Sequence, residues 1–343
     1  STALADQRSC GRVEMENKER GELCFPQHLN TSCRKPRPAW SEGVVLNVTL
    51  FISLLTVVLN LLIIISVSHF RQLHTPTNVF ILSLAVSDFL VGLLLMPLEI
   101  FRNTTCWFLG DVACVLYSYL ITHVVSASVG NIIIISADRY VAICDPLHYP
   151  TRITLARAKC CVGLCWLLYG TYSVFYLKDE LVHLGRANSC VGQCAIVVNA
   201  VTGTVDLILN FIFPVTVIVV LYVRVFVVAV SQARAMRSNA TAVTMRLSVG
   251  LKSKKSELKA ARTLGVVVFV YLMCYCPFYG YVLVIVNLPN TPSVPFLFFL
   301  FYFNSCMNPM IYALFYSWFR KAIKLIVTLQ ILQPGSCQAN VLQ

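Results

Sequence analysis

Long apolar runs separated by short polar segments dominate the chain. Each of the seven longest runs approaches or exceeds the roughly 20 residues that an α-helix needs to cross a bilayer. They fall at about 44–68, 77–101, 112–143, 157–177, 195–229, 260–287 and 293–316. The pattern predicts an all-α fold, a seven-transmembrane helix bundle.

The sequence on either side of these runs divides the chain into three parts. Residues 317–329 alternate basic and apolar positions at helical spacing, which predicts a short amphipathic eighth helix on the inner leaflet. We therefore expect an extracellular amino-terminal segment (1–43), the bundle (44–316), and the amphipathic helix with a cytoplasmic tail (317–343). Because no apolar run precedes residue 44, we expect the first helix to direct membrane insertion.

Basic residues and glycosylation sequons indicate the same orientation. The Lys and Arg residues between the runs, among them Arg152 and Lys252, collect on one side, which the positive-inside rule makes cytoplasmic. Two sequons, at Asn30 and Asn103, fall on the other side. Either sequon alone is weak, because chance matches are common, but their agreement strengthens both. We expect a multi-pass plasma-membrane protein with an extracellular amino terminus.

Composition narrows the class of protein further. Apolar residues make up 57% and charged residues 12% of the chain, and the mean hydropathy is +0.73, unlike soluble domains with about 25% charge. The net charge of +12 does not indicate nucleic-acid binding, because the basic residues lie in the short segments that set membrane topology. No set of residues indicates an enzyme.

Two motifs end the third and seventh runs. Asp138-Arg139-Tyr140 stands at the cytoplasmic end of the third, and Asn308-Pro309-Met310-Ile311-Tyr312 lies in the seventh, within NSCMNPMIYALFYSWF. The first motif alone would also fit a membrane helix that ends in a surface ion pair. Together they resemble rhodopsin-like G-protein-coupled receptors, and the longer seventh-run sequence resembles the trace-amine-associated receptors. The resemblance extends over residues 24 to 330.

The resemblance implies a set of activation residues at the cytoplasmic half. In such receptors Arg139 would contact the G protein when the bundle opens, and Glu257 would pair with Arg139 at rest; a solvated surface glutamate is the alternative. An apolar residue in the second intracellular loop would insert into the G protein, unless this loop is an ordinary turn. Tyr275 stands two residues before Pro277, where most relatives have Trp. The implied residues are Asp138, Arg139, Tyr140, Leu147, Tyr222, Glu257, Tyr275, Pro277, Pro309 and Tyr312.

The resemblance also implies an ion site at mid-membrane. A carboxylate inside the membrane is costly and should face the bundle interior with polar partners. In the receptor family the corresponding oxygen-rich set surrounds an allosteric sodium ion. The residues are Asp88, Ser128, Asn304, Ser305 and Asn308. We favour sodium over a dry hydrogen-bond network and expect no other cofactor.

Cysteines on the extracellular side imply disulfides by the same resemblance. Rhodopsin-like receptors join the start of the third helix to the following extracellular loop, which assigns Cys114–Cys194. Trace-amine-associated receptors tie their amino-terminal segment to the same loop, and the spacing of Cys24 and Cys33 resembles theirs. We assign Cys24–Cys190.

Other pairings remain open from sequence. Cys10 or Cys33 could replace Cys24 as the partner of Cys190, and Cys33 could instead meet Cys106. Cys337 in the tail is either palmitoylated or a free thiol.

A lone acid marks the expected amine site. Most aminergic receptors carry an aspartate seven residues after the third-helix cysteine, and Ile121 stands there instead. Asp206 in the fifth run lies at similar depth and is a candidate for the ammonium, unless Asn210 or Thr202 merely satisfies it as a buried acid. Glu99 is an outlying second acid that a diamine could reach. The expected ligand-binding residues are Asp206, Ile121, Thr122, Val125, Phe278, Tyr279, Tyr302 and Glu99, although aromatic stripes are more often packing.

We therefore interpret the chain as an odorant-type receptor of the trace-amine-associated family that binds a protonated small-molecule amine. The family implies coupling to a stimulatory heterotrimeric G protein and a rise in cyclic AMP. One alternative is a related receptor for a lipid, a peptide or an uncharged odorant. The other is a small transporter, which would need charges along a pathway or repeated broken helices, and neither is present.

Overall fold

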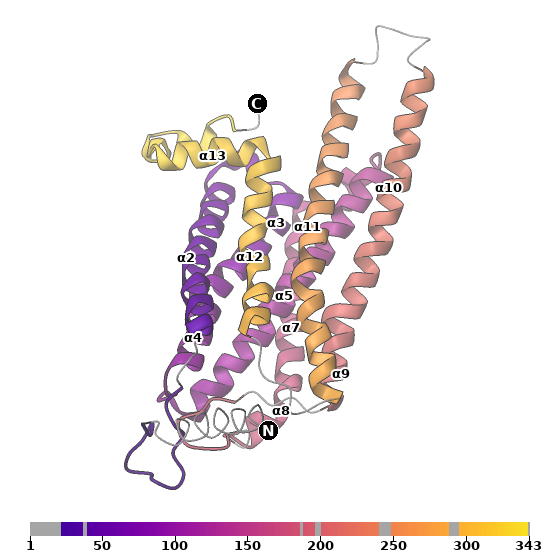
Figure 1. Cartoon of the computed structure of the whole chain (residues 1–343). Helices are drawn as coiled ribbons and strands as arrows, with labels where there is room; N and C mark the ends of the chain where they lie inside the picture. Colours follow the sequence, from indigo (N-terminus) through magenta and orange to yellow (C-terminus); the bar gives the residue numbers. More distant parts are fainter. Residues whose placement is uncertain are drawn as a thin grey trace, which may run out of the picture.

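A computed structural model describes residues 22–36, 40–185, 188–195, 200–239, 248–287 and 295–341. Helices account for most of these residues, and the only β contacts among them are two isolated bridges, Leu23–Arg34 and Ser32–Val191. Figure 1 shows long helices side by side as a bundle, with the short α13 lying across the end near the carboxyl terminus. The expected all-α bundle is confirmed.

Among the described residues, seven helical segments are long and apolar enough to cross a membrane. Two of them contain a short π turn, so each of these two carries three labels. In chain order the elements are α2 (Trp40–His69), η1 (Arg71–Leu73), α3 (Pro76–Leu90), η2 (Val91–Leu95), α4 (Met96–Thr104), α5 (Gly110–Cys144), α6 (Tyr149–Arg152), α7 (Leu155–Tyr176), α8 (Lys178–Val182), α9 (Ala200–Leu207), η3 (Ile208–Ile212), α10 (Phe213–Asn239), α11 (Ser248–Asn287), α12 (Pro295–Phe315), α13 (Ser317–Val327), η4 (Gln330–Leu332) and η5 (Ser336–Gln338).

Local sequence explains where several helices begin. The Thr75 side chain accepts the backbone N–H of Asn78 at 3.3 Å, and Pro76 takes the first position of α3, where a missing N–H costs nothing. Thr154 caps α7 in the same way through the N–H of Arg157 at 3.4 Å. Both starts follow short loops, which the basic residues predict to be cytoplasmic.

The fifth and sixth helices extend beyond their apolar runs. α10 continues to Asn239 and α11 starts at Ser248, whereas the apolar pattern ends near residue 229 and resumes near 260. Hydrophobicity detects only the part inside the membrane, and polar residues with good helix propensity prolong a helix into water. Figure 1 shows these two ends standing clear of the bundle.

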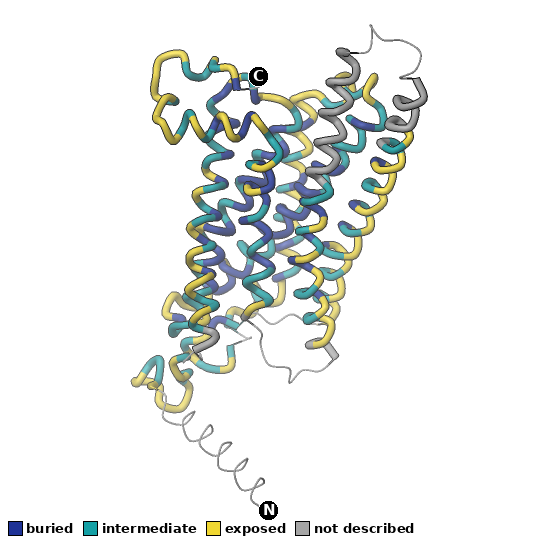
Figure 2. The backbone as a smooth tube through the Cα atoms, turned by 45° about the horizontal axis from the view of Figure 1, so that its top comes forward, coloured by how far each residue is buried: buried dark blue, intermediate teal, exposed yellow. Residues whose placement is uncertain are grey.

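Burial follows the bundle interior. Figure 2 shows buried residues on the inward faces and exposed ones on the rim, as expected of helices whose outer faces contact lipid. In α13, Trp318, Phe319 and Ala322 are buried while Lys321 and Lys324 are exposed. This amphipathic eighth helix agrees with the prediction.

The tail after α13 folds back onto the first intracellular loop. Ser336 lies 3.0 Å from a ring nitrogen of His69, and the backbone N–H of Val341 donates to Gln72 at 3.3 Å. Cys337 is a half-buried free thiol in this tail, and its palmitoylation stays a prediction.

Candidate functional site: an outer acid, a mid-membrane acid and a cytoplasmic arginine

The outer cluster is built around Asp206, near the end of α9. Asp206 Oδ1 accepts the Tyr172 hydroxyl at 2.9 Å and Asn210 Nδ2 at 2.8 Å, and Oδ2 lies 3.4 Å from the Tyr279 hydroxyl. The bond from Asn210 is the contact that the alternative of a buried, internally satisfied acid predicts. Asp206 makes no salt bridge with any basic side chain described in the structure.

Asn210 leaves one polar atom free beside this carboxylate. Its side chain is buried, and Oδ1 has no hydrogen-bond partner among the described atoms. A buried acceptor without a partner is costly. An acid and an unpaired amide oxygen on neighbouring turns can together accept N–H groups from a cation.

Aromatic rings surround the cluster. Phe211 stacks on Tyr279 with ring centroids 4.8 Å apart, and Phe278 packs on Phe301 at 4.5 Å. Of the other expected ligand-binding residues, Val125 and Tyr302 are buried in the bundle core and Ile121 packs against it. The Thr122 hydroxyl donates to the Ser118 carbonyl of its own helix.

Sequence analysis missed Tyr172, which brings the fourth helix into the cluster. Tyr169, Tyr172 and Tyr176 recur at intervals of three and four residues, so they lie along one helix face. That spacing was a signal, but tyrosines on a membrane helix more often pack than bind.

The Glu99 carboxylate already has a cationic partner in this structure. Its carboxylate forms a 2.6 Å salt bridge with Arg102 and accepts Nδ2 of Asn103 at 2.9 Å and the Tyr117 hydroxyl. Arg102 also donates to the Cys194 carbonyl at 3.3 Å, which links the pair to the extracellular loop. The arginine three residues after Glu99 is a visible helical pairing signal. Glu99 therefore carries an internal cation in this structure.

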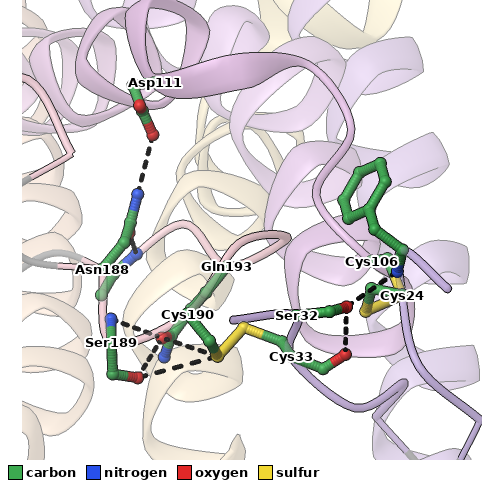
Figure 3. The surroundings of a disulfide bond; sticks show 11 residues. Cys24, Ser32, Cys33, Cys106, Asp111, Asn188, Ser189, Cys190 and Gln193 are labelled. Carbon is green, nitrogen blue, oxygen red and sulfur yellow. Dashed lines mark hydrogen bonds between the residues drawn. A yellow bond between two sulfur atoms is a disulfide. The ribbon is translucent and has the colours of Figure 1, made fainter. Parts of the chain in front are cut away.

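Within the part of the chain that the structure describes, three disulfides join the amino-terminal segment, the loop after α4, α5 and the loop before α9. Cys114–Cys194 joins α5 to the loop before α9, as expected. The assignment of Cys24–Cys190 is wrong: Cys33 pairs with Cys190, and Cys24 pairs with Cys106. Figure 3 shows the Cys33–Cys190 bond next to the Cys24–Cys106 pair.

Backbone pairing explains this correction. The N–H of Cys33 donates to the Val191 carbonyl at 2.8 Å, and Ser32 forms a parallel bridge with Val191, so Cys33 lies beside Cys190. Gly192, at φ +100°, approaches Cys24, and its carbonyl accepts the N–H of Trp107. Cys24 is thereby directed to the loop after α4. Cys10 lies outside the described residues.

The mid-membrane cluster surrounds Asp88, which is fully buried in α3. Asp88 accepts Asn308 Nδ2 at 2.7 Å and the Ser128 hydroxyl at 3.1 Å. The sequence-predicted residues thus converge from α3, α5 and α12. The membrane interior requires such pairing for an ionisable group.

Unpaired atoms at this cluster fit a cation or water. Both side-chain polar atoms of Asn304, and Oδ1 of Asn308, are buried without a partner among the described atoms. Carboxylate, hydroxyl and amide oxygens are the ligands of hard cations. These oxygens fit sodium, and the ion would supply the positive charge that could neutralise the Asp88 carboxylate.

In the cytoplasmic cluster, the Arg139 guanidinium is paired with the carboxylate of the adjacent Asp138. Arg139 Nη2 forms a 2.5 Å salt bridge with Asp138 and also bonds Thr77. Asp138 further accepts the hydroxyls of Thr77 at 2.9 Å and Tyr149 at 2.8 Å. Burial raises the pKa of Tyr149, so this hydroxyl stays a neutral donor at physiological pH.

The other predicted activation residues have varied positions. Leu147 is 88% exposed, so it is available to a cytoplasmic partner. Glu257 lies in α11, but its side chain falls outside the described side chains, so its pairing with Arg139 stays a prediction. Pro277 and Pro309 lie inside α11 and α12. Tyr275 and Tyr312 are buried, whereas Tyr140 and Tyr222 are partly buried.

Both sequons have exposed asparagines. Asn30 lies in a turn of the amino-terminal segment and Asn103 in the last turn of α4. Glycosylation at either stays a prediction.

Comparisons with known proteins agree with this geometry. Residues 59–312 match the family described as 7 transmembrane receptor (rhodopsin family). The chain is 38% identical over 330 residues to trace amine-associated receptor 13c of Danio rerio, covering 93% of this chain and 96% of the relative. It is 37% identical over 350 residues to receptor 7e of Mus musculus, covering 98% and 97%. It is also 37% identical over 338 residues to receptor 6 of Pan troglodytes, covering 93% and 95%.

The fold and these matches define a seven-transmembrane receptor of the rhodopsin family. Within that class, the chain belongs to the trace amine-associated receptors. It is a receptor without enzymatic activity, a multi-pass protein of the plasma membrane that couples to G proteins and responds to small molecules. Membership excludes the transporter alternative.

Proposed function

We propose that this receptor binds a protonated monoamine at Asp206 and in response activates a stimulatory G protein, which raises cyclic AMP. The observation that carries the proposal is the pairing of an ionisable acid with the unpaired Oδ1 of Asn210, inside the membrane and without a described basic partner. An ammonium group would donate hydrogen bonds to both the Asp206 carboxylate and Asn210 Oδ1.

The ligand would lie with its charge towards the fifth helix. Ile121 replaces the third-helix acid of most aminergic receptors, so this position offers no negative charge to the ammonium. The rings of Tyr279 and Phe211 would cover the cation, and a desolvated, charge-assisted hydrogen bond would add affinity. The uncharged body of the ligand would then extend towards α5 and α12.

A second ammonium would meet a cation at the other acid. Arg102 holds Glu99 at 2.6 Å, so the far nitrogen of a diamine would have to displace the guanidinium or lie beside it. This is why we propose a monoamine as the natural class of ligand.

Signalling would require Arg139 to leave Asp138. Ligand binding would favour an arrangement in which the cytoplasmic ends separate and Arg139, Tyr222 and Tyr312 turn towards the G protein, a shift between two populations. In this proposal the amino terminus would lie outside the cell, and the exposed Leu147 would contact the G protein.

A sodium ion at Asp88 is part of the proposal. It would stabilise the resting arrangement by completing the unpaired oxygens of Asn304 and Asn308. Replacing sodium by a large organic cation should then raise agonist affinity in wild type and leave Asp88→Asn unchanged. Equal sodium dependence in both proteins would refute the ion site.

A cyclic-AMP reporter assay tests the function. Cells expressing the chain would be exposed to matched sets of monoamines, diamines and uncharged analogues of the same carbon skeleton. We expect responses to monoamines and none to the isosteric alcohols. A receptor that responds equally to the alcohols would support the alternative of an uncharged odorant.

A further inference from the structure

The chain after α13 turns back towards the bundle. Residues 330–341 form a strap that contains η4 and η5. Two residues in the left-handed conformation reverse its direction, Leu329 at φ +56° before η4 and Gly335 at φ +79° before η5. Figure 2 shows the strap leaving the far end of α13 and returning to the helices of the bundle. It thereby comes to lie against η1, the loop between α2 and α3.

Two hydrogen bonds and one buried residue hold the strap on this loop. The backbone N–H of Val341 donates to Gln72 Oε1 at 3.3 Å, and Val341 is fully buried. A ring nitrogen of His69 lies 3.0 Å from the Ser336 hydroxyl. Because Ser336 donates its only proton to the Ile331 carbonyl at 2.6 Å, His69 is the donor in this contact. The strap is thus attached both to η1 and to the end of α2.

The loop beneath the strap supports Thr77, a partner of Arg139. Leu73 in η1 is fully buried, and its carbonyl accepts Asn78 Nδ2 at 2.8 Å, which joins the loop to the first turn of α3. Thr77 precedes Asn78 in that turn. The Thr77 hydroxyl donates to Asp138 at 2.9 Å, and Arg139 Nη2 also bonds Thr77. A displacement of η1 would therefore move a residue that holds the Asp138–Arg139 pair.

The strap makes few contacts for its length. Among its residues only Val341 is fully buried, while Leu332 and Gln338 are exposed. Ordering such a segment costs conformational entropy at every residue, and few buried contacts offset this cost. Leu329 also adopts a positive φ that residues with a side chain rarely have. The strap is therefore a segment that can be released without unfolding the bundle, as expected of an element that switches between two positions.

We propose that the strap is an autoinhibitory contact. Docked on the loop, it holds η1 and Thr77 in the arrangement in which Arg139 is paired with Asp138. A segment that binds this resting arrangement more tightly than the open one shifts the population towards rest by that difference in affinity. Release of Val341 from Gln72 removes this support. The inference rests on the proposed movement of Arg139, but on neither the amine site nor the type of G protein.

Val341→Arg tests the proposal, because a guanidinium is costly to bury at this position. Gln338→Arg is the matched control, because it adds the same charge to an exposed residue of the same strap. Ligand-free activation is measured at matched surface expression with biosensors for each class of G protein. We expect Val341→Arg to raise it about threefold for at least one class and Gln338→Arg to leave it unchanged. No rise in Val341→Arg with any G protein would overturn the proposal.

Cys337 measures docking independently of signalling, because it is a half-buried thiol within η5. In purified receptor, hydroxylamine first frees this thiol from any thioester, and its reaction with a maleimide is then followed by peptide mass spectrometry. We expect labelling about threefold faster in Val341→Arg than in wild type, and unchanged in Gln338→Arg. Unchanged labelling in Val341→Arg would contradict the role of Val341 in docking.

The two measurements together separate the strap from the proposed function. Faster labelling of Cys337 without a rise in ligand-free activation would show a strap that docks without restraining Arg139, which contradicts the proposal. A rise confined to a G protein of another class would support the strap and refute the stimulatory coupling proposed above. Loss of the amine response in neither Asp206→Asn nor wild type would bear on the amine site alone and leave the prediction for Val341→Arg unchanged.

Discussion

The Tyr172 hydroxyl on α7 donates a 2.9 Å hydrogen bond to the Asp206 carboxylate on α9. This bond joins the fourth and fifth helices at the outer cluster and orients the acid proposed to hold the amine. Tyr172→Phe keeps the ring and removes the donor. We expect the half-maximal amine concentration to rise about tenfold, roughly 1.4 kcal/mol, since bonds to charged groups contribute about 1.5–3 kcal/mol.

Tyr176, one turn further along α7, supplies the control. Its ring packs near Tyr172 at 5.8 Å, and no hydrogen bond from its hydroxyl to Asp206 occurs among the described residues. Tyr176→Phe should change the half-maximal concentration less than threefold. Equal losses in the two variants would mean that the Tyr172 bond has no specific role.

The disulfides predict that replacing either cysteine of one bond causes the same loss of surface expression or response. Cys33→Ser and Cys190→Ser should reduce surface expression or response to the same degree, and the double variant should lose no more than either single one. Cys24→Ser and Cys106→Ser should form a second such pair. Non-reducing peptide mapping checks this directly, and a Cys24–Cys190 peptide would contradict the structure.

The salt bridge between Arg102 and Glu99 leads to a prediction about monoamines and diamines as ligands. Arg102→Gln removes the cation from Glu99 while keeping a hydrogen-bonding side chain, which leaves a buried acid free for a second ammonium. Dose–response curves should show diamine potency rising at least tenfold relative to the monoamine of equal length. Arg102→Lys is the control and should keep the wild-type ratio, because the charge remains. An unchanged ratio in Arg102→Gln would separate Glu99 from the ligand.

Glu257 tests the restraint on Arg139. If Glu257 contacts Arg139 at rest, Glu257→Ala should raise ligand-free cyclic AMP about twofold at equal surface expression, because exposed pairs contribute only about 0.2–1 kcal/mol. Glu257→Asp should give a smaller rise. Wild-type basal signalling in Glu257→Ala would indicate that Asp138 and Thr77 alone hold Arg139.

The helix bundle and the mid-membrane cluster could be predicted from the sequence because physical constraints leave few possible arrangements for either. Helix length follows from bilayer thickness, and a buried Asp88 must meet the polar residues at its own depth. The partners of Asp206 were harder, since Tyr172 lies on another helix and a tyrosine spacing does not distinguish packing from hydrogen bonding. The disulfide error came from spacing alone. The pairing depends on the backbone contact of Ser32 with Val191, which no cysteine count contains.

The account depends most directly on the charge of Asp206. Asp206→Asn keeps the shape of the side chain and removes the charge, so a cyclic-AMP dose–response curve for the most potent monoamine should shift at least a hundredfold at matched surface expression, about 2.7 kcal/mol. Ile121→Asp in that background should restore part of the response by placing an acid on α5. An Asp206→Asn receptor with an unchanged half-maximal concentration would contradict the proposed amine site.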